Sequence, residues 1–125
     1  MDKFNTGNIE ADKYFAALNA ADEGIGQILG TLKKRDELDN TLIFFLSDNG
    51  AVHESPMPLN GMDRGFKGQM YNGGVRVPFI VSWPKKIPAG QVSDIMVSAL
   101  DILPTALNSA GIEIPSTMYI DGKNI

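Results

Sequence analysis

Apolar residues recur every three or four positions between residues 14 and 32, which is the spacing of one face of an α-helix. The positions are Tyr14, Ala17, Leu18, Ala21, Ile25, Ile28, Leu29 and Leu32. Three glycines interrupt this helix pattern at Gly24, Gly26 and Gly30. Each glycine costs about 1 kcal/mol in a helix interior relative to alanine. We therefore expect the glycines to mark close packing of this helix against a neighbour.

Two short apolar runs without polar alternation follow, at residues 41–47 and 77–83. Runs of this kind are typical of strands that are buried on both faces, as in a parallel sheet covered by helices. Residues 92–97 could form a short third strand. A second helix is predicted to begin at Asp101 as its N-cap and to stop at Gly111. The order predicts an α/β fold with a mainly parallel sheet flanked by helices.

Between the two apolar runs, residues 51–76 show little periodicity and contain many Gly, Pro and Asn residues. A connection of this length is uncommon in a compact domain unless it is functional. The predicted core is also thin for a finished domain. We therefore expect the 125 residues to be a single segment of a larger sheet-containing domain.

Composition narrows the function classes. The formal net charge of −4 argues against a nucleic-acid or anionic-membrane partner, because both would repel a net-negative body. The chain has no cysteine, which excludes a disulfide, a thiolate nucleophile and a Cys-ligated metal in this chain. Its longest apolar run, residues 42–46, is far too short to span a bilayer.

Two polar side chains stand where the first apolar run ends. Asp48 and Asn49 offer a carboxylate and an amide oxygen at the carboxyl end of a predicted strand, where α/β sheets bind ligands. Hard oxygen donors suit Ca²⁺ or Mg²⁺. A plain turn is the alternative, because Asp-Asn-Gly is common in turns and two ligands are too few for a site.

The second candidate is Lys67, which lies in a glycine-rich stretch. Glycines allow close backbone approach, and a lysine brings a flexible point cation to an oxyanion. The stretch has no P-loop spacing. A surface loop with a solvated lysine is the alternative reading of the same residues.

Taken in order, these segments resemble type I sulfatases of the alkaline-phosphatase-like superfamily, from about Tyr14 to Gly122. The motifs are Asn40-Thr41, Ser47-Asp48-Asn49-Gly50, Lys67-Gly68, Tyr71-x-Gly73-Gly74-x-Arg76-Val77-Pro78, Trp83-Pro84 and Asp101-x-x-Pro104-Thr105. The resemblance implies a sulfuric ester hydrolase acting on a small-molecule or glycan sulfate ester. A periplasmic or extracellular location is implied by the resemblance alone.

The same resemblance assigns roles to individual residues. Asp48 and Asn49 match two ligands of the active-site cation, usually Ca²⁺, with Mg²⁺ as the second choice. Lys67 matches the lysine that contacts the sulfate and stabilises charge on the leaving side. Arg76 is expected to be structural. Asn72 stands where family members often have Glu, and we leave it out of the site.

The chain does not contain the family's nucleophile motif. Type I sulfatases use a formylglycine made within Cys/Ser-x-Pro-x-Arg, and the nearest match, residues 82–86, ends in Lys and lies at the end of a predicted strand. The resemblance therefore implies the C-terminal part of a catalytic domain, completed by the remainder of that domain, with the formylglycine in the N-terminal part. Alone, the chain is expected to be inactive.

Two other functions stay open. A phosphodiesterase or phosphotransferase of the same superfamily would more often bind two transition metals and contain several histidines, whereas His53 is the only histidine here. A non-catalytic module that binds sulfated glycans could retain Asp48, Asn49 and Lys67 without a nucleophile. His53 itself could face substrate or lie in a solvated loop, and we leave it out of the catalytic set.

Overall fold

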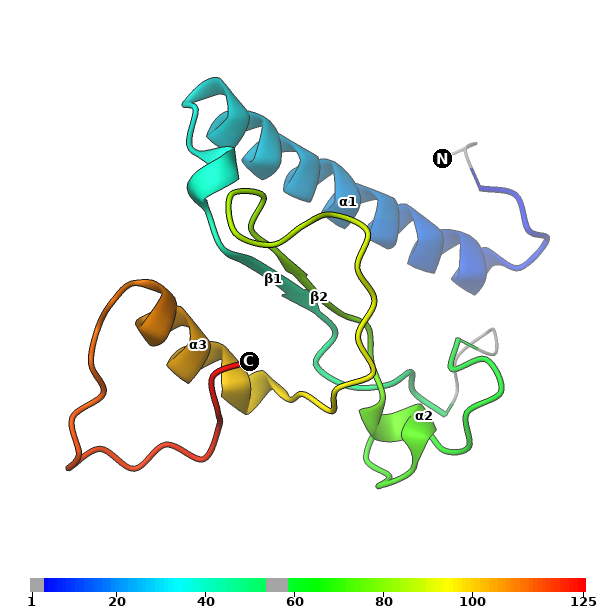
Figure 1. Ribbon diagram of the computed structural model, residues 1–125. Coiled ribbons are helices and arrows are strands. Elements are labelled where there is room, and N and C mark those ends of the chain that lie inside the picture. Colours follow the sequence, from blue (N-terminus) through cyan, green and yellow to red (C-terminus); the bar gives the residue numbers. More distant parts are fainter. Residues whose placement is uncertain (1–3, 54–58) are drawn as a thin grey trace.

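The computed structural model describes residues 4–53 and 59–125 (Figure 1). Helix α1 and helix α3 lie on different sides of a two-stranded sheet, and the short helix α2 lies near the end of β1 (Figure 1). The elements are α1 (Ile9–Lys34), the 3-10 turn η1 (Leu38–Asn40), β1 (Ile43–Leu46), α2 (Asn72–Val75), β2 (Phe79–Ser82), the 3-10 turn η2 (Ala99–Asp101) and α3 (Ile102–Ser109).

Helix α1 confirms the first predicted helix and extends it at both ends. It begins earlier because Asn8 caps it: the Asn8 side-chain oxygen accepts hydrogen bonds from the backbone N–H groups of Glu10 (3.0 Å) and Ala11 (3.2 Å). It ends at Lys34, after which Asp36 adopts a left-handed conformation with φ of 58°. The apolar stripe located the helix, but the polar cap determines where it starts.

The two predicted strands form, but their relative direction differs from the prediction. Strands β1 and β2 pair antiparallel, with Phe44 opposite Val81 and Phe45 opposite Ile80. The sequence predicts a mainly parallel sheet with these strands buried on both faces, and the pair differs on both points. It is antiparallel, and Phe45 and Ile80 are 49% and 55% exposed. An apolar run does not encode strand direction, and the long connection between the strands allows either direction.

The third predicted strand is absent from the described residues. Residues 92–97 have no strand structure, and Val92 and Met96 are 94% and 93% exposed. A strand needs a partner for its backbone hydrogen bonds, and no described segment pairs with these residues. The β-forming preference of these residues is therefore not sufficient to make the segment a strand.

The second predicted helix is confirmed as α3, with its predicted stop at Gly111. Gly111 has φ of +70°, and the N–H of Ile112 reaches back to the Leu107 carbonyl at 2.9 Å. Asp101 precedes α3 but does not cap it with its side chain. Instead, the Asp101 carboxylate accepts backbone hydrogen bonds from Lys123 and Ser98, both at 2.8 Å. These bonds lower the pKa of Asp101 and tie the C-terminal segment to the start of α3.

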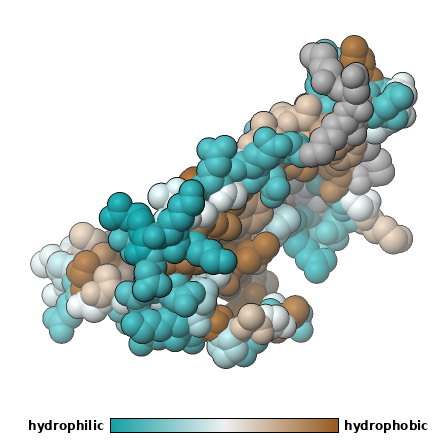
Figure 2. Space-filling model, turned by 90° about the horizontal axis from the view of Figure 1, so that it is seen from above, coloured by the Kyte–Doolittle hydropathy of each residue, from teal (hydrophilic) through white to brown (hydrophobic). Residues whose placement is uncertain are grey.

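The core is small in the part of the chain that the structure describes. Ala11 and Pro104 are the buried residues with aliphatic side chains there, and large apolar residues such as Ile28 are more than half exposed. Figure 2 shows apolar residues reaching the surface between hydrophilic ones on the face seen from above. A methyl group added at Gly24, Gly26 or Gly30 would meet nothing within 4 Å, so the neighbour expected at these glycines is not among the described residues. None of the described helices has the length and hydropathy needed to cross a membrane.

Candidate functional site

Asp48 and Asn49 lie in a tight turn directly after β1. The N–H of Asn49 donates to Asp48 Oδ1 at 2.9 Å, and the hydroxyl of Ser47 donates to the Asn49 carbonyl at 2.9 Å. The Asn49 side-chain nitrogen donates to the Gly50 carbonyl at 2.9 Å. Because the side-chain nitrogen of Asn49 bonds to the Gly50 carbonyl, the side-chain oxygen of Asn49 faces away from that carbonyl. The turn at the strand end is therefore present, and the role of the two side-chain oxygens as metal ligands stays a prediction.

The structure brings the segment of Lys67 beside this turn. The backbone N–H of Lys67 donates to the carbonyl of Ala51 at 2.8 Å, only two residues after Asn49. Lys67 is exposed, as is Asp48, whereas Asn49 is half-buried. The predicted metal pair and the predicted sulfate-binding lysine, which are far apart in sequence, thus share one end of the molecule near α2 (Figure 1).

Three buried glycines allow these segments to meet. The N–H of Gly50 donates to the Gly74 carbonyl at 3.0 Å, and the N–H of Gly73 donates to the Arg64 carbonyl at 2.7 Å. A methyl group on Gly50 would overlap with the Gly73 carbonyl, and one on Gly74 would overlap with the Gln69 carbonyl. The sequence predicts that the glycines of this stretch let backbone approach a ligand. In the structure they let backbone approach backbone.

This close packing predicts a large effect of a small substitution. Gly74→Ala is expected to lower the free energy of unfolding by about 3 kcal/mol, because rigid backbone atoms must move to admit the methyl group. In the 125-residue chain alone, Gly26→Ala is the matched control, since no described atom lies within 4 Å of a methyl group there; it should stabilise that chain by up to about 1 kcal/mol. Urea denaturation of both variants measures the difference. Equal stabilities would contradict the packing argument.

Aromatic and charged side chains contact one another in the segments next to Lys67. The ring of His53 packs edge-on against Phe66 at 4.5 Å between centroids, and the guanidinium of Arg64 lies 4.0 Å from the centre of the Tyr71 ring. These contacts place His53 next to the segment of Lys67 and do not by themselves give it a chemical role.

Arg76 forms an exposed ion pair with Asp63 at 3.8 Å. The side-chain nitrogen of Asn72 lies 3.5 Å from an oxygen of the same carboxylate. Asp63 therefore links the loop before Lys67 to the two ends of α2. This agrees with the structural role expected for Arg76.

Asn60 was missed by the sequence reasoning. Its side-chain oxygen accepts from the N–H of Ala51 at 2.8 Å, and its side-chain nitrogen donates to the carbonyl of Gly65 at 3.0 Å. The residue is half-buried. No periodic signal marks it, because its partners lie nine and five residues away in irregular segments.

The donor set fits a hard cation but does not complete a site for one. Asp48 and Asn49 offer side-chain oxygens that could serve as two ligands, whereas Ca²⁺ takes six to eight and Mg²⁺ six. Within residues 4–53 and 59–125 no group of three or more His, Asp or Glu side chains is arranged to hold a metal ion. Further ligands would have to come from other groups.

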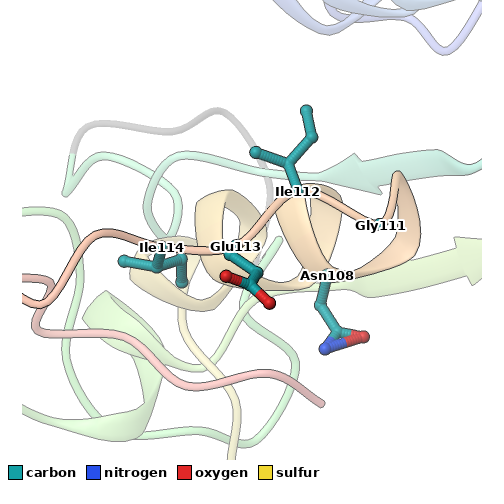
Figure 3. A pocket seen from close by; sticks show the side chains of 5 residues that line it. All are labelled: Asn108, Gly111, Ile112, Glu113 and Ile114. Atoms are coloured by element: carbon teal, nitrogen blue, oxygen red, sulfur yellow. The ribbon is translucent and has the colours of Figure 1, made fainter.

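A hollow of about 440 Å³ lies elsewhere, at the C-terminal end of α3 (Figure 3). Its lining residues are Asn108, Gly111, Ile112, Glu113 and Ile114. In the close-up, the Asn108 and Glu113 side chains lie on one side of the chain and Ile112 points to the other (Figure 3). None of the predicted site residues lines this hollow.

Comparison with known proteins agrees with the resemblance of the motifs. The sulfatase family model matches residues 3–112. The uncharacterized sulfatase YdeN of Escherichia coli (strain K12) is 45% identical over 123 residues, which are 98% of this chain and 22% of YdeN. N-acetylgalactosamine-6-sulfatase of Sus scrofa is 38% identical over 122 residues, which are 95% of this chain and 23% of that protein.

A solved structure matches the fold as well. The crystal structure of Ps i-CgsB in complex with k-i-k-neocarrahexaose superposes with a TM-score of 0.87 at 38% identity, covering 94% of this chain and 26% of that chain. The predicted alkaline-phosphatase-like α/β fold is thereby confirmed. This chain spans less than a quarter of the length of the two curated relatives, at 22% and 23%. By family model, sequence identity and fold, the chain belongs to the sulfatase family.

Proposed function

We propose that this chain is the C-terminal part of a catalytic domain that hydrolyses a sulfate monoester. In this proposal Asp48 and Asn49 bind Ca²⁺, or Mg²⁺ in its place, and Lys67 binds the sulfate. The observation that supports it most is the hydrogen bond of 2.8 Å from the Lys67 N–H to the Ala51 carbonyl. That bond holds the lysine's segment beside the turn that contains the two oxygen donors.

The chemistry of sulfate transfer suits these three side chains. When the ester bond breaks, negative charge is spread over the sulfate oxygens and the leaving oxygen. A bound divalent cation would supply Lewis acidity and orient the sulfate. Lys67 is exposed and carries a flexible ammonium group, so it can contact a sulfate oxygen and stabilise that charge. The nucleophile would be a formylglycine elsewhere in the domain, because this chain has no cysteine and no matching serine motif.

The names of the similar proteins suggest a substrate class. One relative is an N-acetylgalactosamine-6-sulfatase, and the solved neighbour is in complex with a neocarrahexaose. Sulfated glycans are therefore the first natural substrates to assay, with small aryl sulfates as a general probe. The second partner in the proposal is the remainder of the same domain, and the exposed apolar residues of the chain would be covered by it.

The test compares two preparations: the longer protein that contains this chain, and the 125-residue chain alone. With para-nitrophenyl sulfate and calcium, the longer protein is expected to turn over and the chain alone to give background. Turnover of bis-para-nitrophenyl phosphate but not of the sulfate would transfer the proposal to phosphodiester chemistry. Tight binding of sulfated oligosaccharides without any turnover would favour the non-catalytic module.

A further inference from the structure

The amide of Asn60 connects the two arms of the candidate site. One arm is the turn that holds Asp48 and Asn49 and continues into Ala51; the other runs from Gly65 to Lys67. Asn60 accepts a hydrogen bond from Ala51 at 2.8 Å and donates one to Gly65 at 3.0 Å. Both bonds are short, and the residue is half-buried.

Together with one backbone hydrogen bond, the two bonds of Asn60 connect the two arms at two points. Lys67 N–H donates to the Ala51 carbonyl at 2.8 Å, so Ala51 uses its carbonyl for one arm and its N–H for Asn60. Gly65, bound by Asn60, is two residues from Lys67 and has φ of +91°. Gly65 also leaves no room for a methyl group, because Tyr71 Cβ would lie 2.8 Å from it. The backbone that leads into Lys67 is therefore restrained at Gly65, by the hydrogen bond from Asn60 and by the nearby Tyr71 side chain.

We infer that Asn60 is a positioning residue that holds Lys67 at a set separation from Asp48 and Asn49. This inference rests on the function proposed above. Asn60 would act through the backbone, since each end of its amide forms a hydrogen bond to a backbone group. It would act by keeping the lysine where the charge on the sulfate develops, because misplacement by about 1 Å can cost roughly 100-fold in rate.

The position demands an amide of this length. Aspartate offers the acceptor for Ala51 but has no hydrogen to donate to the Gly65 carbonyl, and alanine offers neither. Either change leaves a backbone group without its partner, and loss of such supporting contacts typically lowers activity about 10–100-fold. A residue with a purely structural role would produce a loss of stability, with a loss of rate that does not depend on Lys67.

The experiment is a double-mutant cycle on the longer protein, assayed for kcat with para-nitrophenyl sulfate. Its members are the unsubstituted protein, Asn60→Ala, Lys67→Ala and the double variant, with Asn108→Ala on exposed α3 as the matched control. Asn60→Ala is expected to lower kcat about 10–100-fold in the presence of Lys67. In the Lys67→Ala background the same change should lower kcat by less than about twofold, the scatter of independent effects. An equal factor in both backgrounds would overturn the inference.

A second measurement keeps the two proposals separate. Amide hydrogen exchange at Lys67 and Ala51 is compared between the unsubstituted protein and Asn60→Asp, which retains one of the two bonds. Exchange at Lys67 should become about tenfold faster or more, whereas Ala51, whose N–H keeps a carboxylate acceptor, should change less. Unchanged exchange at Lys67 would overturn the inference even if the enzyme is active. An unsubstituted protein without sulfatase turnover would instead contradict the proposed function.

Discussion

Lys67→Ala is expected to lower kcat for sulfate ester hydrolysis about 100- to 1,000-fold in the longer protein that contains this chain. Removing one preorganised group that faces developing oxyanion charge has that effect in other hydrolases. Lys67 is exposed, and its backbone N–H is bonded to the Ala51 carbonyl beside the turn of Asp48 and Asn49, where the sulfate is proposed to bind. Steady-state kinetics with para-nitrophenyl sulfate measures the loss.

The controls for Lys67 separate its charge from its shape. Lys67→Arg keeps the charge in a planar fork and should recover part of the lost rate, because an arginine presents its donors differently from an ammonium group. Lys85→Ala, at an exposed position after β2, should leave kcat within about twofold. A Lys67→Ala variant as active as Lys85→Ala would mean that the lysine is a solvated loop residue.

Asp48→Ala is expected to weaken binding of the proposed cation strongly and to lower kcat at least about 100-fold. Carboxylate oxygens dominate the affinity of proteins for Ca²⁺, and no described group of three or more acidic or histidine side chains could replace the lost ligand. Activity should be measured against calcium concentration, together with the calcium bound per protein. The variant is expected to need much more calcium for any turnover.

Asp94→Ala is the matched control for Asp48, since it removes an exposed carboxylate in residues 92–97, a segment that contributes no predicted site residue. It should leave both calcium binding and kcat unchanged. If Asp48→Ala retained a full complement of calcium and full activity, Asp48 would be part of an ordinary turn and the ligand assignment would be wrong.

Local patterns predicted the elements of the fold better than their arrangement. The stripe ending at Leu32 located α1, and the apolar runs located β1 and β2. The sequence could not predict the direction of strand pairing, because an apolar run does not encode direction. It also overstated the burial of the strands, since Phe45 and Ile80 are exposed among the described residues. Residues 92–97 show the same limit, since a strand requires a partner that no local pattern can supply.

The sequence predicted some residues of the candidate site and missed others, for a related reason. Asp48, Asn49 and Lys67 were singled out by residue type and by family resemblance, and the structure places their segments together. Asn60 was not, because its role depends on hydrogen bonds between irregular segments that leave no periodic trace. The Gly73-Gly74 pair did signal close approach, but the chain alone could not show that the approaching group is backbone.

The most direct test of the central claim is a crystal structure of the longer protein, grown with calcium and an inert sulfate ester or sulfate ion. We expect a calcium ion about 2.3–2.6 Å from an oxygen of Asp48 and from the side-chain oxygen of Asn49. We also expect the Lys67 ammonium group within about 3 Å of a sulfate oxygen. A cation bound away from Asp48 and Asn49, or a sulfate bound without Lys67, would contradict the proposed function.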